Sequence, residues 1–199
     1  MRSEAAAQVL SCRQAVDDPF QPLAKSLLRL MPRTFRHVSE RKNNEILSVF
    51  PMLKSEFWDE PPSLTYRAVS IWDRWLYSTD DEHLLEASSD EEYAERCAKF
   101  ATLDRSIASN TNIYLGSGRP WPRFKELRDS EHLIHRLSPR YRKGGWMLVL
   151  PDLQIIYTSG DGDEHTRVTY FRDAKLAEPF DEWVEKAGLK YIGGNPPTN

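Results

Sequence analysis

The sequence predicts an α+β fold, in which a mostly helical N-terminal two-thirds is followed by a small antiparallel β-sheet with a C-terminal covering helix. Three patterns predict it: helical spacing of apolar residues before residue 110, strand-like runs between 146 and 172, and an amphipathic segment after Pro179. The length of 199 residues suggests one domain. Its parts are a helical region (1–109), an irregular basic segment (110–145), and a β-hairpin and helix region (146–192).

The first expected helices are marked by prolines. Pro19 and Pro22 open a short helix that ends before Pro32. A second helix is expected from about Asn43, with Pro51 kinking or restarting it. The residues expected on its inner face are Ile46, Leu47, Phe50, Leu53 and Phe57.

A third helix is predicted after Pro61-Pro62, with Ser63 as its N-cap. Its apolar stripe, spaced as one helical face, comprises Leu64, Ala68, Ile71, Trp72 and Trp75. Ser89 and Glu92 then form a capping-box pair before a fourth helix. The inner face expected for that helix is Tyr93, Cys97, Phe100, Ala101 and Ile107.

The last third has the pattern of strands. The apolar run GGWMLVLP and the β-branched run LQIIYT each predict a strand. In TRVTYFR, Val168 and Tyr170 face one way and Arg167 and Thr169 the other. A short helix is expected from near Pro179, with Phe180, Trp183, Val184 and Ala187 inward and Gly188 at C′.

Composition narrows the function classes. A formal net charge of −3 argues against a general nucleic-acid binder. The two cysteines, Cys12 and Cys97, are far apart and outside any CxxC, which argues against a disulfide framework or a structural zinc site. No signal peptide or membrane-length apolar window is evident, so a cytoplasmic protein is expected. The motifs G-x-x-x-x-G-K-[ST] and G-x-G-x-x-G are absent, and no cofactor is predicted.

The stretch TSGDGDEHTR resembles a metal loop at first sight. Counted from Asp161 as an EF-hand, it offers Asp163 at position 3 but fails at positions 5, 6 and 12. One histidine, His165, is too few for zinc. Its glycines and aspartates fit a long hairpin turn between strands, whose acidic tip of Asp161, Asp163 and Glu164 is a candidate contact point for a basic partner.

Two further histidines are spaced for one helix face. His132 and His135 form an HxxH pair, but the zincin pattern H-E-x-x-H is absent because Glu131 lies outside the pair. No metal site is therefore predicted. An enzyme alternative stays open: a hydrolase or nucleotide-handling enzyme that uses His132, His135 or His165 with nearby carboxylates.

The charge layout is the most informative feature. Residues 78–92 contain no Lys or Arg and seven acidic residues, namely Asp80, Asp81, Glu82, Glu86, Asp90, Glu91 and Glu92. Residues 119–143 are strongly basic and carry interleaved aromatics; the candidate surface there is Arg119, Trp121, Arg123, Phe124, Arg140 and Tyr141. The acidic stretch suits a protein partner. The basic stretch is an alternative protein surface, or a nucleic-acid surface for a regulator. In a third interpretation the two segments neutralise each other within the chain or are ordinary solvated faces.

The C-terminal region from Gly144 to Ile192, about a quarter of the chain, resembles small bacterial immunity proteins that neutralise secreted toxins. The likeness lies in the hairpin through WMLVLPDL and IIY and in the helix FDEWVEKAGL. It implies a non-enzymatic cytosolic binder that occludes a toxin's active site through a charged surface. The sequence therefore favours a protein-binding module, with a toxin as partner and the acidic residues of 80–92 and 161–164 as contacts.

Overall fold

The computed structural model describes residues 35–54, 64–76, 81–117, 123–127, 130–137, 145–159 and 165–193. All of them belong to one compact unit, Arg33–Asn199. The helix expected between Pro19 and Pro32 lies outside the described residues, as do Phe57, the expected N-cap Ser63 and Cys12.

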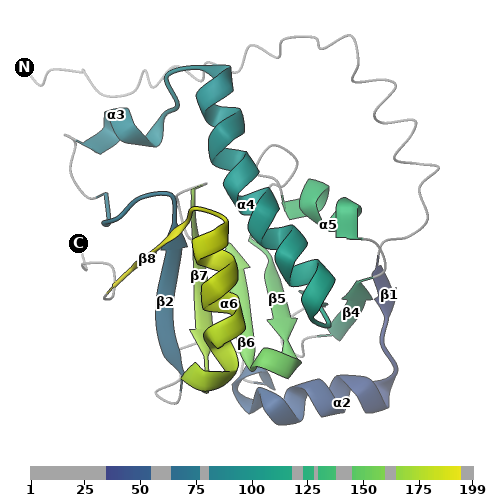
Figure 1. Cartoon of the computed structure of the whole chain (residues 1–199). Helices are drawn as coiled ribbons and strands as arrows, with labels where there is room; N and C mark the ends of the chain where they lie inside the picture. The colour runs from purple at the N-terminus through teal and green to yellow at the C-terminus, as the bar shows by residue number, and fades with distance from the viewer. Residues whose placement is uncertain are drawn as a thin grey trace, which may run out of the picture. The chain divides into compact units, whose positions relative to one another are not determined.

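The described residues form an eight-stranded sheet in which every pairing is antiparallel, in the order β1-β4-β3-β5-β6-β7-β2-β8 (Figure 1). The strands are β1 (Phe35–His37), β2 (Thr65–Ser70), β3 (Tyr114–Ser117), β4 (Arg123–Leu127), β5 (Met147–Leu150), β6 (Ile155–Ser159), β7 (Thr166–Phe171) and β8 (Lys190–Ile192).

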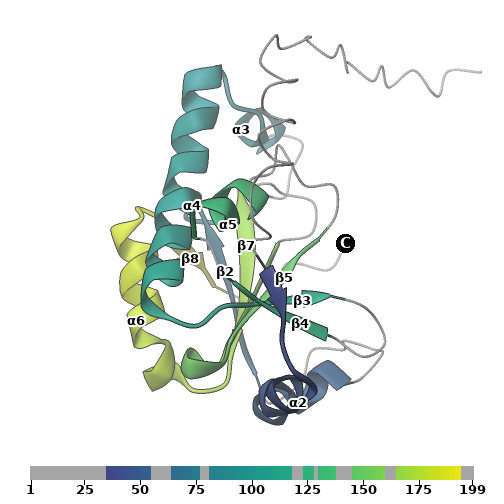
Figure 2. The ribbon, with the colours of Figure 1, turned by 90° about the vertical axis from the view of Figure 1, so that its right-hand side faces the viewer.

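Helices lie on both faces of this sheet. The described helices are α2 (Glu40–Val49), α3 (Glu82–Leu85), α4 (Asp90–Asn110), α5 (Ser130–Leu137) and α6 (Ala174–Lys186), with 3-10 turns η1 (Pro51–Lys54) and η4 (Pro151–Leu153). Figure 2 shows α4 and α6 on one side of the sheet and α2 toward the other. The sheet is thus the middle layer of the described fold.

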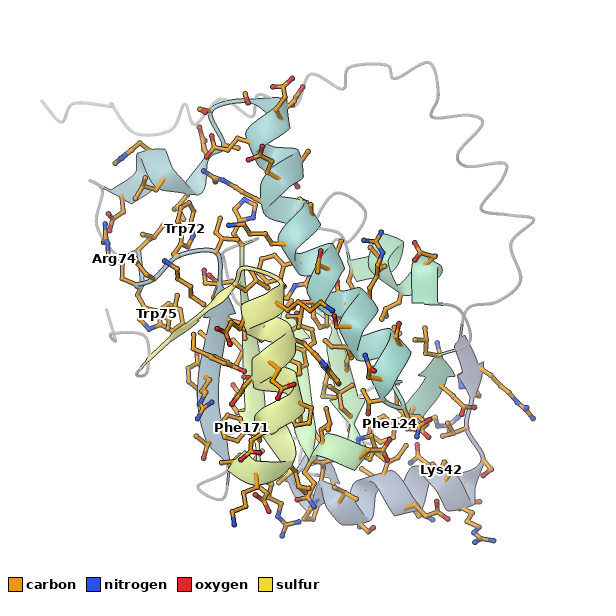
Figure 3. All side chains as sticks on the ribbon, in the orientation of Figure 1. Lys42, Trp72, Arg74, Trp75, Phe124 and Phe171 are labelled. Atoms are coloured by element: carbon orange, nitrogen blue, oxygen red, sulfur yellow. The ribbon has the colours of Figure 1, made fainter. Side chains whose placement is uncertain are left out.

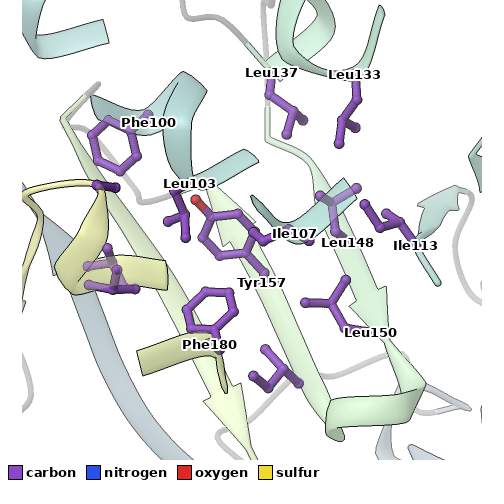
Figure 4. Packing of buried hydrophobic residues seen from close by; sticks show 14 of the residues in the cluster. Phe100, Leu103, Ile107, Ile113, Leu133, Leu137, Leu148, Leu150, Tyr157 and Phe180 are labelled. Carbon is purple, nitrogen blue, oxygen red and sulfur yellow. The ribbon is translucent and has the colours of Figure 1, made fainter. Parts of the chain in front are cut away.

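Each central strand contributes side chains to two hydrophobic cores, one on each face of the sheet. Leu148 lies opposite Tyr157, and the neighbouring pair is Val149 with Ile156. Since successive side chains of a strand point to opposite faces, the first pair packs under α4, α5 and α6, and the second packs against α2 and η1. Figure 4 shows the larger core, where Tyr157 lies between Leu103 of α4 and Phe180 of α6.

The predicted fold class is wrong in two respects. The sheet is large rather than small, and the helices are not concentrated in the N-terminal part. Strands β1 and β2 lie in the region expected to be helical, and the expected irregular segment 110–145 contains β3, β4 and α5. The C-terminal hairpin of β5 and β6 therefore lies at the centre of the sheet, whose first described strand begins at Phe35.

The predicted helix through Leu64 and Trp75 is replaced by strand β2. Its apolar residues do follow a helical spacing, but Thr65, Tyr66 and Val69 are residues that favour strands. This segment pairs with β7 over all six of its residues and with β8 over three. Sheet hydrogen bonds and burial on both faces outweigh the helical periodicity.

Other predicted elements are confirmed. The predicted strands correspond to β5, β6 and β7, and α2 with η1 buries Ile46, Leu47, Phe50 and Leu53. The interruption at Pro51 is present, because α2 ends at Val49 and a 3-10 turn begins at Pro51.

The C-terminal helix is confirmed except at its start. Helix α6 begins at Ala174, five residues before Pro179, because the Asp173 side chain accepts a hydrogen bond from the Lys175 N–H and caps it there. Its end is as expected: Gly188 has φ +67°, and the amide of Leu189 donates to the Val184 carbonyl. β8 follows directly and adds the last strand.

Candidate functional site

The predicted acidic stretch lies on α3 and the first turn of α4. Ser89 is the N-cap of α4, and its hydroxyl oxygen accepts from the Glu92 N–H at 3.2 Å, as the capping-box pattern predicts. The side chains of Glu86, Asp90 and Glu91 are exposed. Glu82 is the first residue of α3, and Asp80 lies outside the described residues.

Two of the predicted contact residues are instead bound within the chain. Asp81, 8% exposed, accepts hydrogen bonds from both terminal nitrogens of Arg74, at 3.0 and 2.7 Å. Glu92 accepts from the N–H and the hydroxyl of Ser88 and from Arg96. These bonds, the Ser88 hydroxyl first, lower the pKa of Glu92 to about 2. Both carboxylates therefore hold the local structure together.

Arg96 connects α3 to α4. Its Nη1 donates to the carbonyl oxygens of Leu84 (3.0 Å) and Leu85 (3.4 Å), while Nη2 donates to Glu92. The guanidinium also lies over the ring of Trp72, 4.9 Å from its centroid. Figure 3 labels Trp72 and Arg74 beneath α3, on the segment that follows β2.

An exposed apolar residue lies inside this acidic region. Leu85 is 41% exposed, and among the described residues only Leu176 is a comparably exposed large hydrophobic side chain. Glu86 follows Leu85 directly, and the exposed Asp90 and Glu91 begin the next helix. We call Leu85, Glu86, Asp90 and Glu91 the acidic corner.

The residue that follows the predicted acidic hairpin loop contacts α4. Asp161, Asp163 and Glu164 lie outside the described residues, but β6 and β7 on either side are antiparallel neighbours, with Ser159 opposite Arg167. His165, the first described residue after the loop, has its ring centroid 5.9 Å from that of Tyr93 in α4. The chain segment that follows the predicted acidic loop thus reaches the N-terminal part of α4, the helix whose first turn carries Asp90 and Glu91.

The histidines of the enzyme alternative have different surroundings. His165 is 3% exposed, and its carbonyl oxygen accepts from the Ser70 hydroxyl at 3.0 Å. His132 and His135 lie three residues apart on α5. Among the described residues, no three His, Cys, Asp or Glu side chains are grouped as a metal site would require.

The basic-aromatic surface lies mainly beyond the described residues, since these exclude Arg119, Trp121, Arg140 and Tyr141. Arg123 is exposed on β4. Phe124 is 1% exposed and packs in the core beneath α2, where its N–H donates to the Asn43 side chain at 3.0 Å. Its ring therefore forms part of the core instead of a stacking surface.

A buried charge cluster was missed by the sequence reasoning. Arg167 Nη1 donates to Asp104 Oδ1 and to the Tyr157 hydroxyl, each at 2.6 Å, and the two charged side chains are 6% and 2% exposed. The guanidinium lies 4.3 Å from the Phe100 ring centroid and 5.1 Å from that of Trp146. This cluster joins α4 to strands β6 and β7 inside the larger core.

Burial and pairing act in opposite directions on these groups. Burial raises the pKa of Asp104, while Arg167 opposes that rise. Burial lowers the pKa of Arg167, but Asp104 and Tyr157 more than offset this and raise it above the ordinary arginine value. The signal in the sequence was Asp104 itself, an acidic residue on the apolar stripe of Phe100, Leu103 and Ile107.

Comparison with protein-family models, with curated proteins and with solved structures finds no match for this chain. None of the described helices has the length and apolar character needed to cross a membrane.

Proposed function

We propose that this chain is a non-enzymatic protein-binding module, and specifically an immunity protein that binds and blocks a cognate antibacterial toxin. The observation that carries the proposal is the exposed acidic corner at the N-terminal end of α4. Asp90 and Glu91 begin this helix, and its Tyr93 contacts His165, the residue that follows the predicted acidic loop.

The corner has the composition of a binding surface. Protein interfaces combine an apolar centre with a polar rim. Leu85 supplies exposed apolar area, and Glu86, Asp90 and Glu91, which follow it closely in the chain, supply exposed negative charge. Such a charge distribution steers a basic partner into place and selects against acidic ones. A basic active-site surface on a toxin is a partner of that kind.

The corner is also held in place by hydrogen bonds within the chain. Glu92 and Arg96 bond to each other, to Ser88 and to the carbonyls that precede Glu86. Fixing these groups before binding reduces the entropy that association would otherwise cost. A preformed acidic corner therefore supports a role in binding better than a role in catalysis.

The test is complex formation with the products of genes adjacent to this one, since toxin and immunity proteins are produced as pairs. The chain and each neighbouring product are co-expressed, and a stable complex and protection of cells from the neighbour's toxicity are measured. We expect both from one neighbour. The absence of any complex or protection would reject the proposal.

Charge reversal then tests the surface. The Glu86→Lys/Asp90→Lys/Glu91→Lys variant is expected to raise the dissociation constant at least about tenfold, or about 1.4 kcal/mol. The matched control is Glu178→Lys/Glu182→Lys/Glu185→Lys, the same change of charge on exposed residues of α6. Equal weakening by both variants would show a general charge effect and remove the corner as the contact.

A further inference from the structure

Helix α3 is a short element held at both ends by arginines. Asp81, immediately before the helix, bonds to Arg74 through both carboxylate oxygens. At the other end, the carbonyls of Leu84 and Leu85 accept from Arg96. Four residues are too few for a helix to be stable without outside support.

This support differs from that of the longer helices. Neither hydrophobic core, as far as the structure describes them, includes a residue of α3 among its buried or partly buried members. Helices α4 and α6, in contrast, contribute Phe100, Leu103, Phe180 and Val184 to the larger core. The attachment of α3 therefore depends strongly on charge-assisted hydrogen bonds, whose strength depends on their geometry.

The Arg96 contact is a fork that other residues cannot reproduce. One terminal nitrogen faces the two carbonyls of α3 and the other faces Glu92, while the flat face lies on Trp72. A lysine ammonium at this position would keep the charge but could not span both sides at once. The arginine side chain is 9% exposed, so solvent screens these bonds little.

We propose that α3 and the turn that follows it, as far as Ser88, form a strap that opens as a unit while the sheet stays folded, with Arg74 and Arg96 as its two latches. Segments with few buried apolar contacts open at lower free energy than the core to which they are attached. The strap carries Leu85 and Glu86, so its closure sets the shape of the acidic corner. This second part rests on the proposed binding function; the opening itself does not.

Native-state hydrogen exchange of the full chain at low urea concentrations tests the opening. The reporter is the Ser88 amide, which donates to Glu92 at 2.8 Å, and the reference is the amides of β6 in the sheet centre. We expect Ser88 protection at least about tenfold lower than that of β6, with a weaker dependence on urea. Equal protection and equal urea dependence would mean that α3 opens only by global unfolding, and would overturn the proposal.

Two variants test whether Arg96 holds the strap closed. Arg96→Lys is expected to speed Ser88 exchange at least about tenfold while β6 amides keep their protection. The control is Arg105→Ala, a change in the same helix as Arg96. It removes an exposed ion pair with Glu131 and should leave the protection of the Ser88 amide unchanged. If Arg96→Lys leaves the protection of the Ser88 amide unchanged, or speeds exchange of the β6 amides equally, the role of Arg96 is overturned.

The same variant separates this inference from the proposed function. With faster Ser88 exchange and weaker toxin binding in Arg96→Lys, both proposals stand. Faster exchange with unchanged binding would keep the strap and reject its part in the corner. Unchanged exchange would reject Arg96 as a latch, whatever the charge-reversal variant does to binding.

Discussion

Helix α4 carries two charge clusters in opposite surroundings. At mid-helix, Asp104 pairs with Arg167 inside the core, where both side chains are nearly inaccessible to water. At the N-terminal end, Glu92 and Arg96 bond to backbone and hydroxyl groups beside the exposed Glu86, Asp90 and Glu91. The first cluster fixes the helix to the sheet, and the second shapes a surface.

The contrast shows what burial does to charge. A buried ion pair stabilises the fold little more than apolar residues of the same shape, because the cost of desolvation offsets the attraction. Removing one partner, however, leaves the other charge buried without compensation. In the N-terminal cluster the Glu92 side chain is 38% exposed, so water can hydrate its carboxylate when a partner is lost. Substitutions in the core cluster should therefore lower global stability, and those at the corner should act locally.

Asp104→Ala is expected to have the largest effect. It leaves the buried Arg167 guanidinium without its carboxylate and should lower the free energy of unfolding by about 3–5 kcal/mol. Urea unfolding followed by tryptophan fluorescence measures the change. The paired substitution Asp104→Leu/Arg167→Met should recover most of the loss; a double variant as unstable as the single one would contradict the contrast.

Tyr157→Phe is expected to have an intermediate effect. The change removes a hydroxyl that accepts from the Arg167 guanidinium but keeps the ring, which packs edge-on against Trp146 and Phe180. Hydrogen bonds to charged groups contribute about 1.5–3 kcal/mol, and a loss of that size should appear in urea unfolding. A loss as large as that of Asp104→Ala would mean that the ion pair depends on the hydroxyl.

The pH response of Glu92 should be smaller and confined to acid. Its pKa in the fold, about 2, lies below the ordinary value of 4.5, so its contribution to stability is complete above the ordinary value. The difference in unfolding free energy between the wild type and Glu92→Gln should shrink as the pH falls from about 4.5 toward 2. A difference that stays constant over that interval would show that the Glu92 charge does not stabilise the fold.

Local sequence signals predicted the elements that local interactions decide. The cap at Ser89, the interruption at Pro51 and the left-handed Gly188 each depend on residues within a few positions. The three C-terminal strands were also found, because their apolar runs and turns are contiguous in the chain.

Long-range pairing decided the rest. The residues from Leu64 to Trp75 follow a helical spacing, but β2 forms because β7 and β8 lie on its two sides. In the same way, β4 pairs with β1 from the start of the described chain, across about 90 residues of sequence. Periodicity within one segment does not include these partners.

The candidate site was predicted in part for the same reason. The acidic stretch can be recognised in the sequence. Which of its carboxylates are bound within the chain cannot, because Asp81 and Glu92 are bound by Arg74 and Arg96. Phe124, placed among surface aromatics by its basic neighbours, is buried because its strand faces α2. Asp104 could have been noticed as a charge on an apolar stripe, but its partner Arg167 lies 63 residues away.

The central claim is that the exposed end of α4 binds a protein partner. Hydrogen exchange of the chain alone and in complex with the neighbouring gene's product tests it most directly. The account predicts slower exchange in the complex at residues 84–95 and at Ser159 and His165, where the acidic hairpin begins and ends. Slower exchange confined to α6 or to β4, with none at these residues, would contradict it.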